Sequence, residues 1–270
     1  MSQRPASLSA LRRDVRSACA RGDLAGLAEI EASLRDDPRA GARELLLRCD
    51  RYRSRRSAEE RRIFDLFALR RRCQAEGARL VAGVDEVGVG PLAGPVVAAA
   101  VILPESVDLP GLNDSKKVPR EKRERLAGWI REQALGFAIG EVSPLEIDRV
   151  NILQATLEAM RRAVAGLPTQ ATPDHVFVDA RTIPGLSMPQ TAIVNGDSRD
   201  ASIAAASIVA KVYRDRQMRE LDAVHPAYGF ARNMGYPTPE HFEALRVHGP
   251  CEIHRRSFRP VSDAIRGRLT

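Results

Sequence analysis

One stretch of the sequence, residues 80–97, constrains the fold more than any other. It reads LVAGVDEVGVGPLAGPVV: an apolar run ends in the adjacent carboxylates Asp85 and Glu86, and a glycine-rich turn leads into a second apolar run. Short apolar runs bounded by turn residues are typical of buried strands. The stretch therefore predicts a buried hairpin with acidic side chains at its mouth. Because alternate residues of a strand face opposite sides, we expect the strand to end near Asp85, so that both acids serve one site.

The glycines and acids of this hairpin are suited to a ligand. Gly88, Gly90 and Gly94 permit backbone conformations that other residues resist, and they let a ligand approach the main chain. Neighbouring carboxylates repel each other and are costly to bury unpaired, so a divalent cation would stabilise both. An isolated Asp-Glu pair more often belongs to a surface hairpin whose acids face water. The rest of the chain has to decide between these interpretations.

Length and composition bound the classes of protein. A chain of 270 residues, 44% of them hydrophobic, forms one large domain or one domain with a smaller appendage. No apolar run reaches the roughly 18 residues that a membrane span needs, and the amino terminus lacks the apolar stretch of a secretory signal, so we expect a cytoplasmic protein. The four cysteines are scattered without a C-x-x-C pair, which favours reduced thiols over zinc or disulfides.

The positive charge is concentrated at the amino terminus. Residues 1–79 hold 19 arginines, no lysine and 12 acidic residues, a net charge of +7, whereas residues 80–270 are neutral with 23 basic and 23 acidic residues. Such a segment attracts phosphate backbones, although a run of charge is also common on a solvated helix face. Both interpretations stay open.

Two patterns of secondary structure divide the chain. Residues 1–76 predict a small all-helical extension, with one helix over 39–50 and another opened by the capping-box pattern at Ser57 and stopped by Gly77. From residue 79 onward, strands alternate with helices. The expected strands cover residues 79–85, 95–103, 135–142, 175–179 and 190–194. The predicted class is α/β, a mixed five-stranded sheet flanked by helices, with a domain over 79–262 and a tail over 263–270.

Two further carboxylates stand at predicted strand ends. Asp179 ends the run His175–Val178, and Asp197 follows the next strand. A lone strand-end aspartate is usually a turn residue, but three such places are harder to explain that way, and ligands of open α/β sheets bind at strand ends. Oxygen-rich sites suit Mg²⁺ or Mn²⁺.

The chemistry that these acids indicate is metal-assisted phosphoryl transfer. The sequence has no Ser-His or Cys-His arrangement, Walker motif or dinucleotide fingerprint, so a nucleic-acid backbone is the expected substrate. In such chemistry one cation activates water and a second stabilises the leaving oxygen.

Several blocks of the sequence resemble bacterial ribonuclease HII. The similarity runs from about residue 80 to 261, and the helices before it look like an extension that some members of this family carry. The matching blocks are VDEVG at 84–88 with GPLAGP at 90–95, LNDSKK at 112–117, IAAASIVAKV at 203–212 with RDR at 214–216, YGF at 228–230, GYPT at 235–238 and HRRSF at 254–258.

The resemblance implies a ribonuclease H-like fold and an endonuclease that cuts the RNA strand of RNA–DNA duplexes. It also implies cleavage on the 5′ side of single ribonucleotides in DNA, which leaves a 3′-hydroxyl and a 5′-phosphate and serves ribonucleotide excision and primer removal. The metal-binding acids would be Asp85, Glu86, Asp179 and Asp197, the same four that the strand ends indicate. We expect Asp85 to bridge two Mg²⁺ or Mn²⁺ ions, with Glu86 and Asp179 at one ion and Asp197 at the other.

The resemblance also implies a set of substrate-binding residues. The loop Gly88-Val89-Gly90 would meet the 2′-hydroxyl of the ribonucleotide through its backbone, and Tyr236 would pack on the following sugar. Contacts to phosphates near the site are expected from Asn113, Ser115, Lys116, Ser207, Lys211 and Arg214. Ordinary turn chemistry or pairing with acids is the alternative for these six. His254 and Arg255 would serve the substrate or lock the carboxy-terminal segment.

Three positions depart from the family pattern by losing a basic residue. Val89, Asn195 and Met234 stand where a basic residue is usual, and each loses a charge-assisted contact to phosphate. The basic extension would compensate if it held the duplex.

Two other functions stay open on the sequence. One is a broader hybrid nuclease of the ribonuclease HIII kind, and the other is a catalytically silent RNA–DNA binding module. The expected partners are RNA–DNA hybrids and DNA duplexes that contain ribonucleotides. A replication clamp stays open as a further partner, without support in the sequence. No membrane partner is expected, and we expect a monomer.

Overall fold

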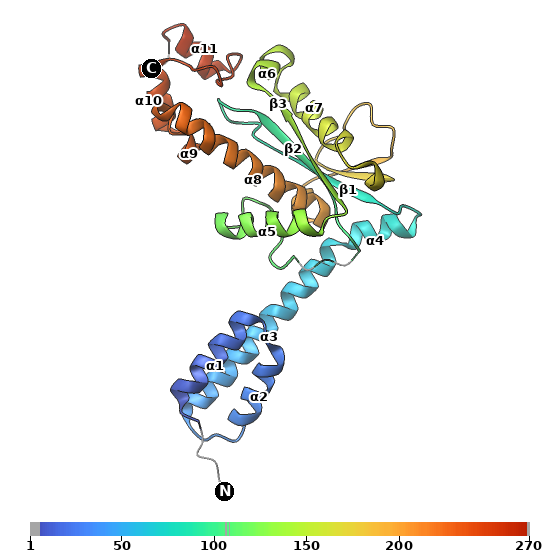
Figure 1. The fold of residues 1–270 in the computed structure, drawn as a ribbon, viewed down its shortest axis with the longest axis vertical. Coiled ribbons are helices and arrows are strands. Elements are labelled where there is room, and N and C mark those ends of the chain that lie inside the picture. The colour runs from blue at the N-terminus through green and yellow to red at the C-terminus, as the bar shows by residue number, and fades with distance from the viewer. Residues whose placement is uncertain (1–5, 106, 108, 269–270) are drawn as a thin grey trace. The chain divides into compact units, whose positions relative to one another are not determined.

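The computed structural model describes residues 6–105, 107 and 109–268 (Figure 1). The chain forms two compact units, Met1–Arg62 and Ile63–Thr270. In the described part of the chain, no helix is both long and apolar enough to span a membrane.

The amino-terminal unit is a small helical assembly. It contains α1 (Leu8–Arg21), α2 (Leu24–Leu34) and most of α3 (Ala40–Leu66). Ser7 caps the start of α1, and Asp23 caps α2 by accepting a hydrogen bond from the amide of Gly26. Each helix also has an apolar side, and these sides pack together as the core of the unit. The buried core residues are Leu11, Val15, Ala18, Leu27, Leu34, Ala42, Leu45 and Cys49.

The expected break in the helices near residue 57 does not occur. The helix α3 runs without interruption through Ser57, and a short helix α4 (Ala68–Ala75) follows it. The capping-box pattern was misleading because residues 51–56 contain no glycine or proline that would end the preceding helix. The division between the units also lies earlier than the predicted residue 76, because Leu66 and Phe67 are buried in the core of the second unit.

The second unit is built on a mixed five-stranded sheet, as predicted. The strand order is β3-β2-β1-β4-β5; β1, β2 and β3 pair antiparallel, and β4 and β5 run parallel to β1. The strands are β1 (Val81–Val87), β2 (Val96–Ile102), β3 (Gly136–Val142), β4 (His175–Asp179) and β5 (Gln190–Ile193). The strand β1 does not end at Asp85, because Glu86 and Val87 still pair with Ala98 and Val97 of β2.

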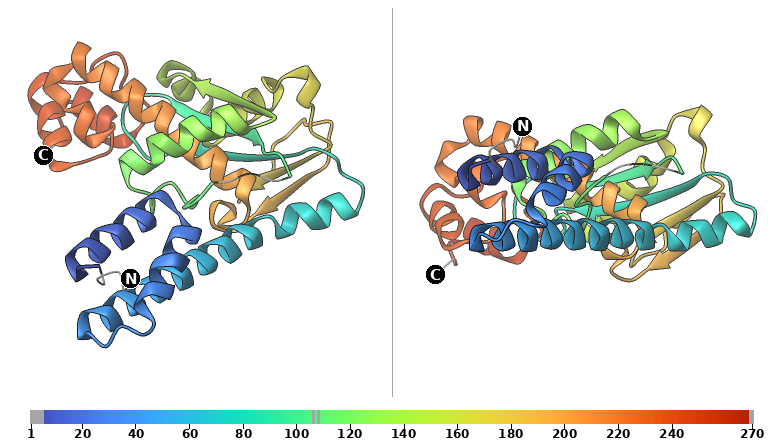
Figure 2. Two further views of the ribbon diagram at one scale, coloured as in Figure 1. Left: turned by 60° about the horizontal axis from the view of Figure 1, so that its bottom comes forward. Right: turned by 90° about the horizontal axis from the view of Figure 1, so that it is seen from below.

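Helices cover both faces of the sheet (Figures 1 and 2). The helices α5 (Arg120–Gln133) and α8 (Ala201–Val224) pack on one face, and α6 (Pro144–Val150) and α7 (Ile152–Ala165) cover the other. Residues of β2 alternate between the two cores, so the whole strand is buried. Gly83 of β1 lets α8 approach closely, because a Cβ atom there would overlap the backbone of Ser202.

The carboxy-terminal segment packs near the end of α8 (Figure 1). Its helices are α9 (Phe230–Asn233), α10 (Pro239–His248) and α11 (Arg259–Ile265). Together with Leu92 and Ala93 they form a separate apolar cluster, which joins the glycine-rich loop to the end of the chain. The helix α11 continues past residue 262 into the segment predicted to be a tail.

Candidate active site

Three of the four predicted acids form one cluster. Asp85 and Glu86 lie near the end of β1, and Asp179 is the last residue of the adjacent parallel strand β4. One carboxylate oxygen of each residue lies within 4.8 Å of the others. The parallel pairing of β1 with β4 ends at Val84 and Val178, so the three acids follow the last paired residues. The two neighbouring acids therefore reach one site although β1 continues through them.

Burial makes this cluster unfavourable for negative charge. Asp85 is only 6% exposed, and burial and the charge of Glu86 raise its pKa well above the usual value, while a hydrogen bond with Ser207 acts in the opposite direction. Burial also raises the pKa of Glu86, against the effect of Arg181, whose Nε lies 3.4 Å from Glu86 Oε1. The other oxygen, Oε2, is buried and has no hydrogen-bond partner among the described residues.

The donor set fits a hard divalent cation. The cluster offers only carboxylate oxygens, without thiol or imidazole, which is the chemistry that Mg²⁺ and Mn²⁺ prefer. A cation would offset the repulsion between the acids and would give the unpartnered Glu86 Oε2 a partner.

The fourth predicted acid, Asp197, lies beside the cluster. It belongs to the short turn of helix Gly196–Ser198, whose first amide donates a 2.7 Å hydrogen bond to Asp179 Oδ1. Burial raises the pKa of Asp197, and the nearby carboxylates of Asp114 and Asp179 raise it further, while Lys116 acts in the opposite direction. Asp197 thus interacts electrostatically with the cluster without being one of its three close carboxylates.

Two residues at the site were missed by the sequence interpretation. Asp114 contacts the carboxyl group of Asp197, and Arg181 pairs with Glu86. Asp114 lies inside the LNDSKK block, and Arg181 follows the strand-end Asp179 by two residues, so both positions carried a detectable signal. Between Asp179 and Arg181, Ala180 has a φ of +50°, a strained conformation for a residue with a side chain.

The predicted phosphate-contacting residues divide into two groups. Asn113 and the exposed Lys116 lie on the turn beside Asp197. Ser115 and Ser207 are buried and share a 2.9 Å hydrogen bond between their hydroxyl oxygens, and Ser207 also contacts Asp85. These two serines therefore support the carboxylate of Asp85 from behind.

Lys211 is engaged within the protein. Its Nζ lies 2.6 Å from Asp215 Oδ1, and Arg123 approaches the other oxygen of the same carboxylate at 3.6 Å. The structure thus gives Lys211 the ion pair that was the alternative interpretation of this position.

Arg214 is fully buried beneath the glycine-rich segment. It donates hydrogen bonds of 2.9 to 3.0 Å to the carbonyls of Pro95, Met234 and Ala93. Burial lowers its pKa to about 10. This placement does not fit direct contact with a substrate phosphate, because the guanidinium already donates hydrogen bonds to three carbonyls. Arg214 instead positions the glycine-rich segment.

A second buried arginine, Arg255, holds the glycine loop. It donates to the carbonyls of Gly88, Val89 and Gly94 at 2.6, 3.0 and 3.0 Å. Gly88 has a φ of +88°, and a Cβ atom there would overlap the side chain of Arg214. Burial lowers the pKa of Arg255 to about 9. The loop conformation therefore depends on two buried arginines, Arg214 and Arg255, whose guanidinium groups donate to carbonyls and not to carboxylates.

Tyr236 stands next to the open side of this loop. It is 39% exposed, and a Cβ atom on the exposed Gly90 would lie 3.7 Å from its ring. The amide of Leu92 donates to the carbonyl of Gly235 at 2.8 Å, which joins the two segments. The structure thus brings together the loop and the tyrosine that were predicted from separate blocks.

A pair of buried histidines fixes the turn that carries Tyr236. The amide of Cys251 donates to His254 Nδ1, so His254 Nε2 carries a proton and donates to His241 Nε2 at 3.0 Å. His241 Nδ1 then donates to the carbonyl of Tyr236 at 2.9 Å. Burial lowers the pKa of both rings, that of His254 to about 3. His254 thus has the locking role that was one of its two predicted roles.

The three positions without the usual basic residue have different environments. Val89 packs against the core that lies between the sheet and α7. Met234 joins the carboxy-terminal apolar cluster and accepts a hydrogen bond from Arg214. Asn195 has a φ of +56°, a left-handed conformation that asparagine tolerates well. Two of the three replacements thus contribute apolar contacts.

This chain is similar to known proteins of one family. The family described as Ribonuclease HII matches residues 82–261. A ribonuclease HII from Geobacillus kaustophilus (strain HTA426) is 52% identical over 233 residues, which are 86% of this chain and 88% of that protein. One from Anaeromyxobacter sp. (strain Fw109-5) is 50% identical and aligns with 88% of this chain and 75% of its own length.

Solved structures share the fold. The ribonuclease H2 from Pyrococcus horikoshii OT3 superimposes with a TM-score of 0.58 at 28% identity, covering 69% of this chain and 97% of that one. The ribonuclease HII in the PCNA complex from Archaeoglobus fulgidus gives a TM-score of 0.57 at 26% identity, covering 67% and 96%. The family match covers two-thirds of this chain, and relatives are about 50% identical to it. The chain is therefore a member of the ribonuclease HII family, endonucleases with ribonuclease H activity on RNA–DNA hybrids.

Proposed function

We propose that this ribonuclease cuts on the 5′ side of single ribonucleotides embedded in duplex DNA, as well as within RNA–DNA hybrids. The observation that carries the proposal is the position of Tyr236 beside Gly90 in a loop whose conformation is fixed from behind. A loop that recognises one 2′-hydroxyl has to present its backbone in a single conformation, because the contact is a short directional hydrogen bond.

The free amides of the loop supply the recognition groups. Arg255 takes the carbonyls of Gly88 and Val89, whereas the amides of Val89 and Gly90 donate to no group in the part of the chain that the structure describes. These amides are available to a substrate oxygen, and the exposed face of Tyr236 is available to the adjoining sugar. In this proposal the side chain of residue 89 takes no part, so Val89 is tolerated.

The catalytic carboxylates would hold two Mg²⁺ or Mn²⁺ ions. Asp85 would contribute to both ions, and Glu86 and Asp179 would contribute to one of them. Asp197 would contribute to the other ion, with Asp114 beside it. When bound, such ions supply an activated water and stabilise the leaving oxygen of a phosphodiester. The chain's own contribution is orientation, because Ser207 holds Asp85, the amide of Gly196 holds Asp179, and Arg181 holds Glu86.

Cleavage of two labelled substrates tests the proposal. One is a DNA duplex with a single ribonucleotide and the other an RNA–DNA hybrid, each with Mg²⁺, Mn²⁺ or EDTA. We expect metal-dependent cutting of both, with the lone ribonucleotide cut on its 5′ side to leave a 3′-hydroxyl and a 5′-phosphate. Cutting of the hybrid alone would assign the broader specificity of ribonuclease HIII, and intact binding without any cutting would indicate a binding module.

The setting of the reaction is part of the same proposal. We assign the protein to the cytoplasm as a monomer that acts in ribonucleotide excision and primer removal, on the basis of its substrate. The archaeal relative is seen in complex with PCNA. Binding of a replication clamp by this chain stays a prediction.

A further inference from the structure

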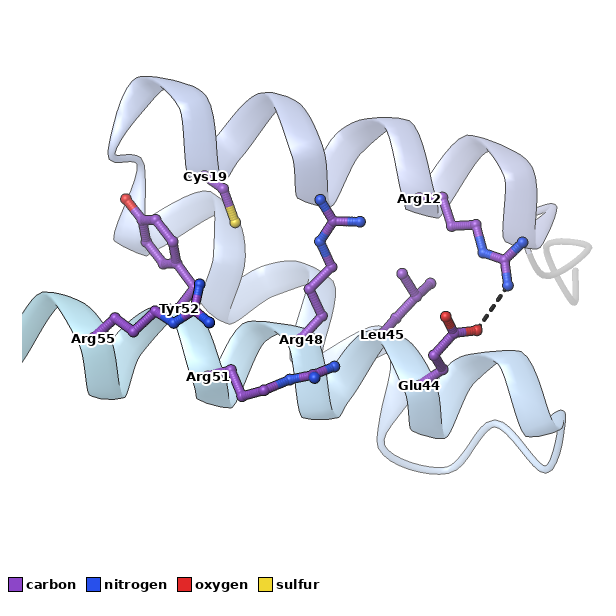
Figure 3. Close-up of a pocket in the computed structure, with 8 residues that line it drawn as sticks. All are labelled: Arg12, Cys19, Glu44, Leu45, Arg48, Arg51, Tyr52 and Arg55. Carbon is purple, nitrogen blue, oxygen red and sulfur yellow. Dashed lines mark hydrogen bonds and ion pairs between the residues drawn. The ribbon is translucent and has the colours of Figure 1, made fainter. Parts of the chain in front are cut away.

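Four of the eight residues that line a groove in the amino-terminal unit are arginines (Figure 3). It lies along α1 and α3 and has a volume of about 400 Å³. Its lining residues are Arg12, Cys19, Glu44, Leu45, Arg48, Arg51, Tyr52 and Arg55. The groove thus contains four guanidinium groups and one carboxylate. This local excess of positive charge favours the binding of an anion.

Three of these four arginines have no acidic partner among the described residues. Arg12 pairs with Glu44 at 2.8 Å, and Arg51 reaches only the carbonyl of Leu47 on its own helix at 3.1 Å. Arg48 and Arg55 form neither an ion pair nor a hydrogen bond with any residue that the structure describes. In Figure 3 the side chain of Arg48 extends from α3 toward α1.

Other arginines of the same unit are paired with acids. Arg53 contacts Glu31 at 2.6 Å, and Arg56 contacts Glu60 at 2.9 Å. Arginines without an acidic partner in the described part of the chain also occur elsewhere on α3, and what distinguishes Arg48 and Arg55 is that they share one groove with Arg12 and Arg51.

The spacing of the groove arginines is helical. Arg48, Arg51 and Arg55 are separated by three and four residues, so they lie on one face of α3, where like charges repel one another. An anion between them removes the repulsion, and the planar guanidinium fork matches phosphate oxygens in pairs.

The length of the row formed by Arg48, Arg51 and Arg55 suits a phosphodiester backbone better than a single phosphate ion. Seven residues separate Arg48 from Arg55, a rise of about 10 Å along the helix. This is close to the rise of three base-pair steps along one strand of duplex DNA, about 3.4 Å each, which join four successive phosphates. A free phosphate would occupy only part of such a row.

We propose that this groove binds the phosphodiester backbone of duplex nucleic acid through Arg12, Arg48, Arg51 and Arg55. The contact is additional to the catalytic site and independent of cleavage, because its ligand is duplex DNA without any ribonucleotide. Since both units belong to one chain, a duplex held by the groove has a raised effective concentration at the second unit. Such a contact offsets the basic residues missing at Val89, Asn195 and Met234.

Two double variants of the full-length protein test the proposal. R48Q/R55Q removes two charges from the groove. The matched control, R43Q/R61Q, removes two exposed arginines that lie on α3 outside the groove and have no ion pair or hydrogen bond among the described residues. Affinity for an all-DNA duplex is measured with EDTA over a range of salt, so that cutting plays no part. Thermal melting of both variants confirms that they are folded.

The expected result is specific to the groove. R48Q/R55Q lowers the slope of log affinity against log salt by about 2, so its deficit relative to the unmodified protein shrinks about tenfold between about 50 and 200 mM salt. R43Q/R61Q changes the slope by less than about 1. Equal changes in both variants would mean diffuse attraction and would overturn the proposal, as would an unchanged slope in R48Q/R55Q. Thermal stabilisation by inorganic phosphate that is lost in R48Q/R55Q, with unchanged DNA affinity, would reduce the groove to a site for small anions.

Discussion

Arg255 Nη2 donates a 2.6 Å hydrogen bond to the carbonyl of Gly88, a residue 167 positions earlier in the chain. The same side chain also donates to the carbonyls of Val89 and Gly94, and it forms no ion pair with a carboxylate of the described residues. A buried guanidinium is stable here because three carbonyl oxygens accept hydrogen bonds from its N–H groups. The geometry of the glycine loop is thus determined from the far end of the chain.

Replacing Arg255 with Lys tests this relationship. An ammonium group cannot reach three carbonyls in the plane of a guanidinium, so we expect a loss of roughly 2–4 kcal/mol in the free energy of unfolding. Cleavage at a single ribonucleotide should fall more than cleavage of a long hybrid, because only the former depends on the loop. The control is R256K, at an exposed neighbour. Equal loss on both substrates would show that Arg255 acts on stability alone.

Asp85→Asn tests the catalytic cluster. We expect cutting to fall by about a thousandfold or more, which corresponds to roughly 4 kcal/mol of transition-state stabilisation, while the dissociation constant for the uncut duplex changes little. In EDTA the variant should be as stable as the unmodified protein or more stable, because a buried acid beside Glu86 is removed.

Thermal melting supplies the second readout for this variant. Mg²⁺ should raise the melting temperature of the unmodified protein and have a smaller effect on the variant. Substantial cutting by Asp85→Asn would remove Asp85 from the metal site.

The pH dependence of stability should reveal Asp200. This residue caps α8 by accepting hydrogen bonds from the amides of Ser202 and Ile203, yet its Oδ2 has no partner among the described residues, and burial raises its pKa to about 6. Because the folded-state pKa lies above the unfolded value, the folded protein keeps a proton that the unfolded chain loses. Stability is therefore lost as the pH rises from about 4 to 6, by roughly 3 kcal/mol.

Asp200→Asn should remove this pH dependence. Urea unfolding at pH 4.5 and 7.5 measures it, with the unmodified protein and Asp65→Asn, an exposed site, for comparison. The Asn variant can still cap the helix through its amide oxygen. If the difference in stability between Asp200→Asn and the unmodified protein were the same at both pH values, the titration would belong to another group.

His254→Asn tests the histidine pair behind Tyr236. Asparagine is too short to join the amide of Cys251 to His241, so the 2.9 Å contact from His241 to the Tyr236 carbonyl loses its support. We expect KM for the single-ribonucleotide substrate to rise about tenfold, since loss of about one well-placed interaction has this effect, with a smaller change in kcat.

The control for this variant is His248→Asn, an exposed histidine on α10. Stability provides a further readout. The folded-state pKa of His254 is lowered, so the protein loses stability as the pH falls below about 6.5, and this loss should be smaller in His254→Asn. A variant with unchanged KM would separate the histidine pair from substrate recognition.

Much of the catalytic unit could be predicted from the sequence because its signals are local. Apolar runs placed all five strands, and their carboxylate ends located Asp85, Glu86 and Asp179, which the structure brings within 4.8 Å. The strand containing Asp85 was predicted to end too early. Its continuation depends on pairing with β2, and the glutamate side chain is long enough to reach the site from the next position.

The environment of charged residues could not be predicted in the same way. Nothing in the local sequence distinguishes Arg214, which is buried under carbonyls, from an arginine that binds phosphate. Its partners at Pro95 and Ala93 lie about 120 residues away in the sequence. The unbroken helix α3 was missed for a different reason, since the Ser57 capping pattern has meaning only where the preceding helix has already ended.

The long sequence separation between Arg255 and the glycine loop also affects synthesis of the protein. Chains emerge from the ribosome amino terminus first, so the strands and the acidic cluster can assemble before residue 255 has been added. The loop that we propose to read the 2′-hydroxyl lacks its buried guanidinium until then. An unfinished chain therefore has its acidic cluster before it has the fixed loop that we propose selects the substrate, and we expect ribosome-bound chains stalled before residue 255 to be folded in the sheet but unselective.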